Sequence, residues 1–325
     1  MTQPAMTENN GLPLDPSPFG MIMHAAVRFP GGARLILILF LVAICGACEA
    51  PVRTGPGGYI YFGSGNYLGK FSLYDGSSQV VAYLGDLSAV AVGPYSDGDL
   101  LLTVRRVVNQ QDTRMIGHFE VAQNHYKTLF IGDTAVYLPD REITVYDDGF
   151  AIQTSRIEDR ERKITTVYSH GHHERVTLVT ISDSEILFQI AARDSNRVFH
   201  YDAVKESLAE LNTLAEECDL EGALWVADQE QMLCHRPGDP RANREYRFVS
   251  PDGVVGAILQ LPTENVFRPI VYLPEKQLLV LTELWQGLWS RKVRYGVWIY
   301  ELDSGESYRL AKDQYLGDHV VLKSL

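Results

Sequence analysis

The sequence predicts an all-β fold, a β-propeller of six blades in which each blade is a four-stranded antiparallel sheet. Three observations lead to this prediction. Short apolar segments separated by Gly, Asp, Ser and Pro turns run from Tyr59 to the C-terminus. Two kinds of hairpin alternate along this part. The turns at Asp75 and Asp303 lie five repeats apart, which is a period of about 46 residues. Four strands in about 40 to 50 residues are typical of one propeller blade.

The first kind of hairpin has an aromatic or β-branched first arm, and we expect it to form the outer strands of a blade. Alternating apolar and polar residues on either side of a turn predict such a hairpin. Six copies begin at Lys70, Gly117, Ile164, Arg197, Glu245 and Val297.

The second kind of hairpin lies between consecutive copies of the first and supplies the inner strands. Because alternation alone does not distinguish a propeller from a β-sandwich, the sandwich is the alternative fold. Five copies of this hairpin begin at Ala89, Ile143, Val179, Ala223 and Pro269.

The two ends of the repeat region predict how the ring closes. Tyr-Leu-Gly-Asp begins at Tyr83, before an expected inner strand, and occurs again at Tyr315 near the C-terminus. Residues 319–323 then form an inner strand with no blade after it, whereas residues 59–84 supply three outer strands with no inner strand before them. We expect the C-terminal strand to complete the first blade, because an open edge would invite aggregation.

The N-terminal region predicts export. Arg28 and Arg34 precede the apolar run from Leu35 to Ala47, which is shorter than the about 20 residues that a helix needs to cross a bilayer. Basic residues, an apolar run and small residues in this order form a secretory signal. Cys45 and Cys48 have the Cys-x-x-Cys spacing, but neither a βαβ context nor a second ligand pair accompanies them.

Gly46, Ala47 and Cys48 resemble the lipobox of bacterial lipoproteins, in which small residues precede a cysteine that is lipidated, palmitate being one such lipid, and becomes the mature N-terminus. The third residue before that cysteine is usually leucine and is Cys45 here. The resemblance implies lipidation at Cys48, with plain signal cleavage or an uncleaved anchor as alternatives. The predicted parts are an N-terminal extension and signal peptide over 1–47, a lipidated tether over 48–58 and the propeller domain over 59–325.

The lipobox resemblance also implies a location. In that family, an aspartate after the lipidated cysteine typically retains lipoproteins in the inner membrane of enteric-type bacteria, and Glu49 stands here instead. We therefore expect a cell-envelope protein that is lipid-anchored in the outer membrane where the host has one. Residues 49–58 are rich in Pro and Gly and should hold the domain off the bilayer.

The domain from Tyr59 onward resembles the six-bladed propellers of periplasmic and surface proteins, including the TolB-like and NHL-like groups. The resemblance rests on the period and on Ser250 to Gly253, whose Ser-Pro-Asp-Gly is similar to the Asp-Gly turn of TolB-like blades. Hydrolases on six-bladed propellers assemble acids and histidines from different blades at the central channel. A scattered enzyme site would therefore escape a motif search.

Composition and motifs argue against several functions. The net charge of −12 disfavours general nucleic-acid binding. The sequence has no Gly-x-Ser-x-Gly elbow, His-Glu-x-x-His helix or EF-hand loop, so we predict no catalytic residue from motifs and no cofactor. The histidines at 170, 172 and 173 could hold a divalent metal, but polar residues are expected at a hairpin tip anyway, and no metal site is predicted.

The segment from Glu283 to Gly296 is the strongest candidate for a binding surface. Trp together with Arg is the composition of binding hot spots, and loops on a rigid scaffold often carry binding. The alternative is that the tryptophans cover the edge of a blade. The candidate binding residues are Trp285, Trp289, Arg291, Lys292 and Arg294.

Propeller geometry places the loops between second and third strands on one face of the ring. We expect this face to mix arginines with acids and the opposite face to be acidic. Exposed ion pairs of this kind contribute under about 1 kcal/mol each, and recognition of an anionic partner is the sharper interpretation. The basic residues expected in these loops are Arg105, Arg106, Arg114, Arg156, Arg160, Arg162, Lys163, Arg193, Arg197, Arg236, Arg241, Arg244, Arg291, Lys292 and Arg294.

The function that follows is a lipid-anchored, non-enzymatic, monomeric propeller that binds a protein or an anionic envelope polymer through the arginine-bearing face. The alternative is an envelope hydrolase or lyase with a site at the channel. Cys218 and Cys234 are the cysteines of the domain, and export places them in an oxidising compartment. Whether they form a disulfide depends on a geometry that the sequence does not contain.

Overall fold

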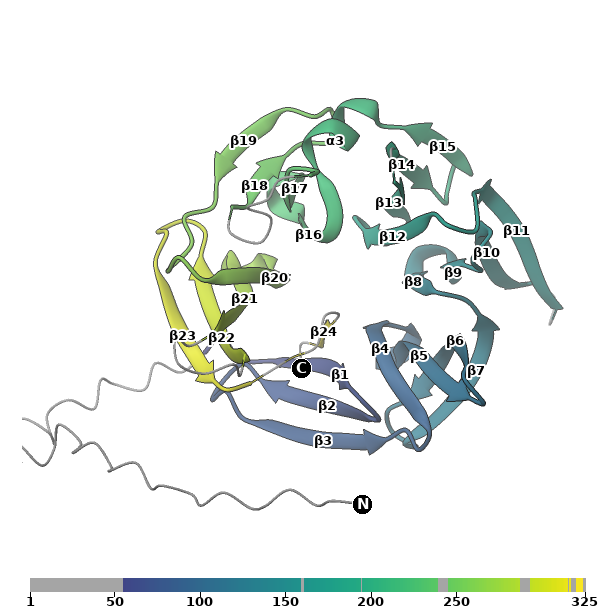
Figure 1. Ribbon diagram of the computed structural model, residues 1–325, viewed down its shortest axis with the longest axis horizontal. Helices are drawn as coiled ribbons and strands as arrows, with labels where there is room; N and C mark the ends of the chain where they lie inside the picture. Colours follow the sequence, from purple (N-terminus) through teal and green to yellow (C-terminus); the bar gives the residue numbers. More distant parts are fainter. Residues whose placement is uncertain are drawn as a thin grey trace, which may run out of the picture. The chain divides into compact units, whose positions relative to one another are not determined.

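Six four-stranded sheets form a closed ring in the computed structural model (Figure 1), so the predicted six-bladed β-propeller is confirmed. The structure describes residues 55–158, 161–193, 195–238, 245–286, 293–314, 316 and 320–323. In this part of the chain, neighbouring strands of every sheet are antiparallel. Each blade follows the chain order from its innermost strand outward, except that blade 1 takes its innermost strand from the C-terminus.

The first three blades follow one another in the N-terminal half of the chain. Blade 1 contains, from the innermost strand outward, β24 (Val320–Lys323), β1 (Tyr59–Ser64), β2 (Tyr67–Ser72) and β3 (Ser78–Tyr83). Blade 2 contains β4 (Leu87–Pro94), β5 (Leu100–Val108), β6 (Gln111–Glu120) and β7 (His125–Ile131). Blade 3 contains β8 (Thr134–Leu138), β9 (Ile143–Asp147), β10 (Ala151–Glu158) and β11 (Glu161–Ser169).

The last three blades complete the ring. Blade 4 contains β12 (Arg175–Thr180), β13 (Glu185–Ala192), β14 (Ser195–Asp202) and β15 (Ser207–Glu210). Blade 5 contains β16 (Asp219–Val226), β17 (Gln231–His235), β18 (Arg247–Val249) and β19 (Val255–Ile258). Blade 6 contains β20 (Val266–Leu273), β21 (Leu278–Gln286), β22 (Val293–Glu301) and β23 (Ser307–Lys312). The short helices are η2 (Ser96–Gly98), η3 (Pro139–Arg141), α3 (Asn212–Glu217), η4 (Ala227–Gln229) and η5 (Pro274–Lys276).

The core lies between neighbouring blades, around their second strands. β5 begins with a buried run from Leu100 to Val104, and β9 is buried over its whole length. A strand that is covered on both faces needs apolar or paired side chains in succession, which explains these runs. The outermost strands β15 and β19 are exposed throughout. The blades therefore hold together mainly through their inner halves.

The C-terminal strand closes the ring as the sequence predicts. β24 pairs with β1, with Lys323 opposite Tyr59 and Val320 opposite Phe62. Strands β1, β2 and β3 would otherwise form a blade with an open inner edge, and β24 satisfies the backbone groups of that edge.

Blade 3 differs from the predicted hairpin assignment. Its first two strands are joined through η3, so the segment from Ile143 contains the turn between the second and third strands, not the first hairpin. The segment from Ile164 runs from the outer strand of blade 3 into the inner strand of blade 4. The Asp148 carboxylate accepts hydrogen bonds from the amides of Phe150 and Ala151 at 2.9 and 2.8 Å. This strong local turn signal does not reveal which strands it joins.

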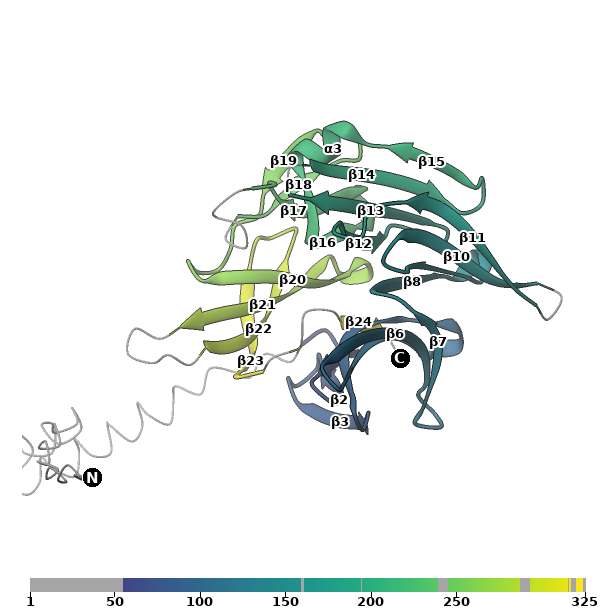
Figure 2. The same ribbon diagram turned by 45° about the vertical axis from the view of Figure 1, so that its right-hand side comes forward.

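The corrected strand assignment of blade 3 changes the expected location of two groups of residues. The histidines from 170 to 173 lie in the connection between blades 3 and 4, not at a hairpin tip. Arg156, Arg162 and Lys163 lie in the hairpin between the third and fourth strands of blade 3, which extends beyond the other strands of the blade (Figure 2). Antiparallel strands place that hairpin on the opposite side from the loops between second and third strands. Arg160 lies outside the described residues.

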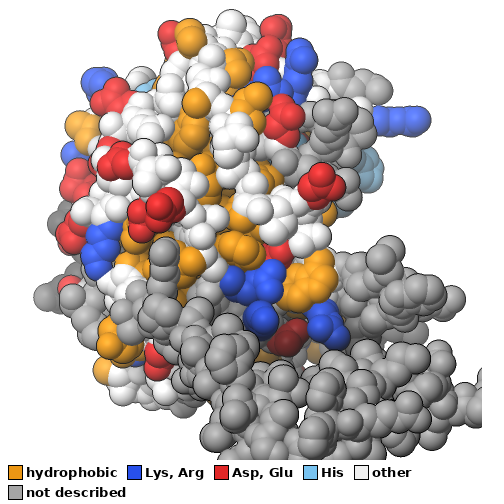
Figure 3. Space-filling model, turned by 90° about the vertical axis from the view of Figure 1, so that its left-hand side faces the viewer, with side chains coloured by type: hydrophobic (Ala, Val, Ile, Leu, Met, Phe, Trp, Pro, Cys, Tyr) orange, Lys and Arg blue, Asp and Glu red, His pale blue; other side chains and the backbone are white. Residues whose placement is uncertain are grey.

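We name the two loop faces of the ring by what they carry. The connection face carries the connections between blades and the loops between second and third strands. The turn face carries the turns between first and second strands and between third and fourth strands. Figure 3 shows basic, acidic and apolar side chains interspersed over the side formed by blades 5 and 6, without a large area of one sign among the residues drawn in colour.

The chain reaches the domain at the turn face. The compact unit begins at Thr54. The amide of Gly55 donates to the carbonyl of Tyr74 at 2.7 Å, and Nζ of Lys276 donates to the carbonyl of Pro56. Tyr74 and Lys276 belong to turns of blades 1 and 6. Residues 55–58, which the sequence assigns to the tether, therefore contact the propeller. Among the described residues, no helix is long and apolar enough to cross a membrane.

Candidate functional site

The innermost strand of blade 5 carries a wide bulge. Asp219 on β16 pairs with His235 on β17, and residues 220–223 then face Cys234 before regular pairing resumes. Gly222 in the bulge has φ +71°, a conformation that glycine adopts at little cost. Bulges occur often next to functional sites, where they re-aim side chains. The bulge therefore marks this end of β16 as a candidate site.

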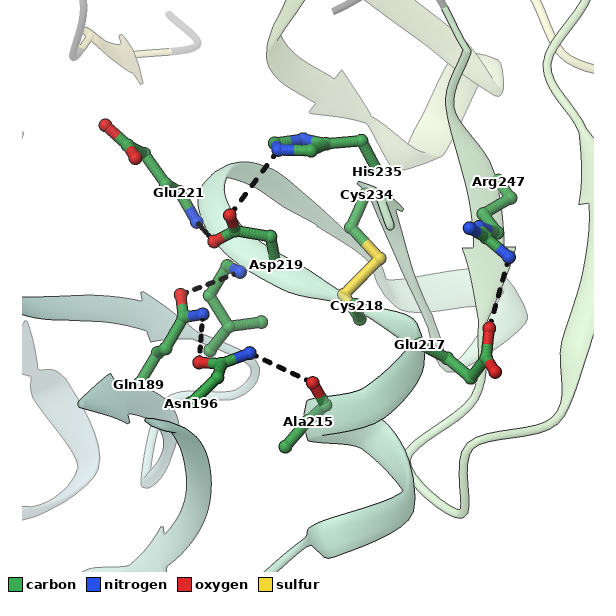
Figure 4. The surroundings of a disulfide bond; sticks show 11 residues. Gln189, Asn196, Ala215, Glu217, Cys218, Asp219, Glu221, Cys234, His235 and Arg247 are labelled. Carbon is green, nitrogen blue, oxygen red and sulfur yellow. Dashed lines mark hydrogen bonds and ion pairs between the residues drawn. A yellow bond between two sulfur atoms is a disulfide. The ribbon is translucent and has the colours of Figure 1, made fainter. Parts of the chain in front are cut away.

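A disulfide holds the base of the bulge (Figure 4). Cys218 and Cys234 are bonded, and their Cα atoms are 5.6 Å apart. Each cysteine directly precedes one member of the pair formed by Asp219 and His235. The bond therefore fixes the backbone of both residues, and both sulfur-bearing side chains are fully buried.

Blade 4 supports the bulge with two side-chain amides, the buried Gln189 and the partly buried Asn196, also drawn in Figure 4. Oε1 of Gln189 accepts the amide of Leu220 at 2.9 Å, and Nε2 of Gln189 donates to Oδ1 of Asn196 at 2.5 Å. Nδ2 of Asn196 donates to the carbonyl of Ala215 at 2.9 Å. These bonds tie the start of β16 and the end of α3 to strands β13 and β14. A network of this kind makes the local backbone rigid.

Asp219 and His235 form a close acid and base pair. Oδ2 of Asp219 lies 3.5 Å from Nε2 of His235, and Oδ1 accepts the amide of Glu221 at 3.0 Å. Burial pushes the pKa of Asp219 upward, but the hydrogen bonds from His235 and Glu221 outweigh burial and hold the pKa below its usual value. Asp219 is therefore a carboxylate at neutral pH.

Charged side chains from three inner strands meet beside the bulge. Nη1 of Arg175 on β12 lies 2.7 Å from a carboxylate oxygen of Glu221 on β16, and both side chains are about half exposed. A Cβ atom at Gly222 would lie 3.2 Å from Nε of Arg268 on β20. Glycine thus lets the arginine approach the backbone. We call Arg175, Asp219, Glu221, His235 and Arg268 the inner-strand cluster.

The two ring nitrogens of His235 have different surroundings. Within the described part of the chain, its Nδ1 has no hydrogen-bond partner, and that atom is buried. Its Nε2 faces Asp219. A general base must reach the proton that it removes, directly or through one water. Because one nitrogen is occupied and the other is covered, the cluster offers exposed charges at Arg175 and Glu221 but no accessible base at His235.

The predicted binding segment is described in part. Trp289, Arg291 and Lys292 lie outside the described residues. Trp285 on β21 is opposite Arg294 on β22, and Arg294 is exposed. The half-buried Trp285 contacts the protein itself, as the following cluster shows.

Trp285 belongs to a buried cluster around Glu283. The Arg309 guanidinium lies 5.1 Å from the Trp285 ring centre and 4.9 Å from that of Trp298, and its Nη2 is 2.6 Å from Oε2 of Glu283. Glu283 is fully buried. Its carboxylate also accepts Nε1 of Trp298 at 2.7 Å and Nδ2 of Asn265 at 2.7 Å. This arrangement corresponds to the alternative in which a tryptophan covers the blade.

His170, in the connection between blades 3 and 4, has protein oxygens beside both of its ring nitrogens. Nε2 of the buried His170 lies 2.9 Å from Oδ1 of Asp147, and Nδ1 lies 3.0 Å from the carbonyl of Gly171. Both ring nitrogens face oxygen acceptors, so neither has a lone pair directed to a metal ion. The described residues contain no group of three or more potential metal ligands in a suitable arrangement.

Comparison with known proteins supports the fold alone. No family model and no curated protein matches the sequence. Among solved structures, TolB from Acinetobacter baumannii is similar with a TM-score of 0.54 and 15% identity, covering 86% of this chain and 68% of that one. A putative TolB from Agrobacterium tumefaciens has a TM-score of 0.54 and 10% identity, with 83% and 99% covered. The TolB-like fold is therefore shown, whereas function is not.

A structure of a nidogen/laminin complex is similar to nearly the same degree. It has a TM-score of 0.53 and 10% identity, and the match covers 83% of this chain and 100% of that one. The same fold thus occurs in proteins with different names. The residues of a site, rather than the fold, must carry a functional argument.

Proposed function

We propose that this protein is a lipid-anchored propeller of the cell envelope that binds a protein or an anionic envelope polymer through its connection face, without catalysing a reaction. The fold supports the binding role, and the sequence of the N-terminal region supports the lipid anchor. The TolB-like ring is a rigid scaffold, and Cys48 follows the small residues of a lipobox.

The position at which the chain reaches the domain carries the proposal. Residues 55–58 contact turns of blades 1 and 6 on the turn face. In this proposal the lipidated Cys48 precedes these contacts by only a few residues of sequence. The connection face is on the opposite side of the ring from these contacts, and we assign the partner to it.

The inner-strand cluster gives the connection face a prearranged polar centre. β12, β16 and β20 begin on this face and bring Arg175, Glu221 and Arg268 together. The disulfide and the side-chain amides of Gln189 and Asn196 in blade 4 hold the bulge in place. Pre-organisation of this kind lowers the entropy lost on binding. Arg175, whose side chain is 59% exposed, can donate to a carboxylate or phosphate group of a partner.

Site-specific photo-cross-linking tests which face is used. A benzoylphenylalanine probe would replace Arg193, which is exposed on the connection face, or Ser304, which is exposed in a turn of blade 6 on the turn face. In cells that make the full chain, the Arg193 probe should yield a discrete higher-mass adduct and the Ser304 probe should not. Adducts from Ser304 without adducts from Arg193 would contradict the assignment of the face.

Membrane fractionation tests the anchor. Cys48→Ser removes the predicted lipidated thiol, so this variant should leave the membrane fraction, since two acyl chains or one chain plus a second signal are needed for stable anchoring. Cys45→Ser is the matched control and should remain in the membrane. A Cys48→Ser protein that stays as firmly bound as the wild type would show that the lipobox interpretation is wrong.

A further inference from the structure

A groove lies at the seam where blade 1 meets blade 6. It encloses about 310 Å³ and is formed by residues of β1, β2 and β3 together with the residues that follow β23. Ligand pockets begin at about 300 Å³, so the space suits one or two small rings. Its principal lining residues are Phe62, Tyr67, Ser78, Gln79, Asp313 and Gln314.

The groove has an aromatic floor because a glycine faces it. Phe62 on β1 pairs with Gly69 on β2, and a Cβ atom at Gly69 would lie 2.3 Å from the Phe62 ring. The missing side chain therefore leaves room for the ring across the sheet. Tyr67 lies on β2 two residues before Gly69, on the same face of the strand, and is half-buried. Two aromatic side chains thus line one side of the groove.

The rim of the groove is polar and mostly neutral. Oγ of Ser78 donates to Oε1 of Gln314 at 3.0 Å, which joins blade 1 to blade 6 at one end. Gln79 is exposed beside Ser78. Asp313 has φ +56°, and its amide donates to the carbonyl of Tyr295 at 2.7 Å. Non-glycine residues in this conformation are uncommon and occur often at functional sites.

We propose that the seam groove binds a glycan through one or two neutral or N-acetylated pyranose rings. A pyranose has a C–H face that packs on aromatic rings and a rim of hydroxyl groups that donate and accept hydrogen bonds. Tyr67, which is half-buried, matches the first surface beside Phe62, which is only 5% exposed, and Ser78, Gln79 and Gln314 match the second. Asp313 is the charged residue of the lining and disfavours an anionic ligand.

This site goes beyond the proposed function. It lies at the seam of blades 1 and 6, whereas the inner-strand cluster lies on blades 4 to 6 around β16. The two sites also differ in chemistry, because the cluster contains two arginines and the described residues that line the groove include no basic one. Either site can fail a test without affecting the other.

Binding of defined oligosaccharides tests the proposal. The probes are chitotriose and maltotriose, added to the full chain in a detergent without a sugar headgroup and followed by saturation-transfer NMR and calorimetry. At least one probe should bind with a dissociation constant below about 10 mM, and Tyr67→Ala should weaken binding about tenfold. Tyr83→Ala is the matched control, because Tyr83 is opposite Tyr67 on β3, is 75% exposed and does not line the groove.

A second variant keeps the test valid if Tyr67→Ala fails to fold. Gln79→Ala removes an exposed side chain, so its melting temperature should match the wild type while binding of the probe weakens. The adduct from the Arg193 probe should persist in Gln79→Ala, which separates this site from the inner-strand cluster. Absence of binding for both oligosaccharides, or equal weakening by Tyr67→Ala and Tyr83→Ala, would overturn the proposal.

Discussion

Blades 5 and 6 each contain an acidic side chain beside a basic one, and the two acids differ in how deeply they are buried. Glu283 in blade 6 is fully buried and receives donors from Arg309, Trp298 and Asn265. Asp219 in blade 5 keeps 19% of its side chain exposed, and its carboxylate faces Nε2 of His235 and the amide of Glu221.

The difference separates a structural role from a functional one. A buried carboxylate that receives several donors makes a region rigid and specifies one packing arrangement. An acid that is partly exposed contributes less to folding and can still contact another molecule. We therefore assign the Glu283 cluster to the stability of the interface between blades 5 and 6. The inner-strand cluster carries the proposed binding.

Removal of the Glu283 carboxylate should have the largest effect. Glu283→Ala leaves the Arg309 guanidinium without its counter-ion and leaves Nε1 of Trp298 without an acceptor. Breaking a buried pair in this way costs about 3 to 5 kcal/mol in the free energy of unfolding. Urea denaturation measures the loss, and Glu275→Ala, an exposed residue of η5 in the same blade, is the control. A loss below about 1 kcal/mol would show that the cluster is not structural.

Loss of the disulfide should cause the second largest loss of stability, and the loss should be concentrated in blade 5. The bond joins residues 16 positions apart, and a loop of about that length is worth about 3 kcal/mol in the chain-entropy estimate. The double variant Cys218→Ala and Cys234→Ala should be destabilised by about this amount. Hydrogen exchange should quicken at Leu220, whose amide bonds to Gln189, before it quickens at β21. Equal protection in both proteins would mean that the bond does not hold the bulge.

Substitutions of Trp285 and Arg294 should differ in their effect on stability, although both residues were predicted to bind a partner. Trp285→Ala removes a ring that stacks on Arg309, and cation–π contacts in partly buried sites are worth about 2 kcal/mol. Arg294→Ala removes an exposed charge and should change the stability by less than about 0.5 kcal/mol. Thermal unfolding followed by circular dichroism measures both. Two variants of equal stability would favour the binding interpretation of Trp285.

The smallest expected effect is the change in the free energy of unfolding with pH that is due to Asp219. Its pKa is lower in the folded protein than in the unfolded chain, so the carboxylate stabilises the fold above the unfolded value of about 3.9. That contribution disappears as the pH falls through the folded pKa. The wild type should therefore lose its advantage over Asp219→Asn as the pH falls from about 5 to below 3. A difference in unfolding free energy that is constant with pH would exclude this linkage.

Most of the fold could be predicted because its signals are local or repeated. The Tyr-Leu-Gly-Asp that begins at Tyr83 and at Tyr315 identified the strand that closes the ring. Blade 3 was misassigned because the turn from Asp147 to Gly149 joins its second and third strands, whereas the assignment took it as the turn between the first two strands. A second repeat would have prevented the error, since Val-Tyr-Leu-Pro occurs at 136–139 and again at 271–274, before the first turns of blades 3 and 6.

The candidate site was harder to predict because its residues come from three blades. Arg175 and Arg268 approach β16 only in the closed ring, and the bulge that brings them near follows from a register shift. One signal was present in the sequence, since Asp219 and His235 directly follow the two cysteines of the domain. The role of Trp285 was missed for a similar reason, because its cationic neighbour, Arg309, lies on a strand further along the chain.

The yield of the adduct from the Arg193 probe, compared between two backgrounds, tests the contrast between the clusters. Arg175→Ala should abolish most of the adduct while the melting temperature stays near that of the wild type, because Arg175 is 59% exposed. Glu283→Gln should lower the melting temperature and retain the adduct in proportion to the folded protein. An Arg175→Ala protein that cross-links as efficiently as the wild type would contradict the assignment of binding to the inner-strand cluster.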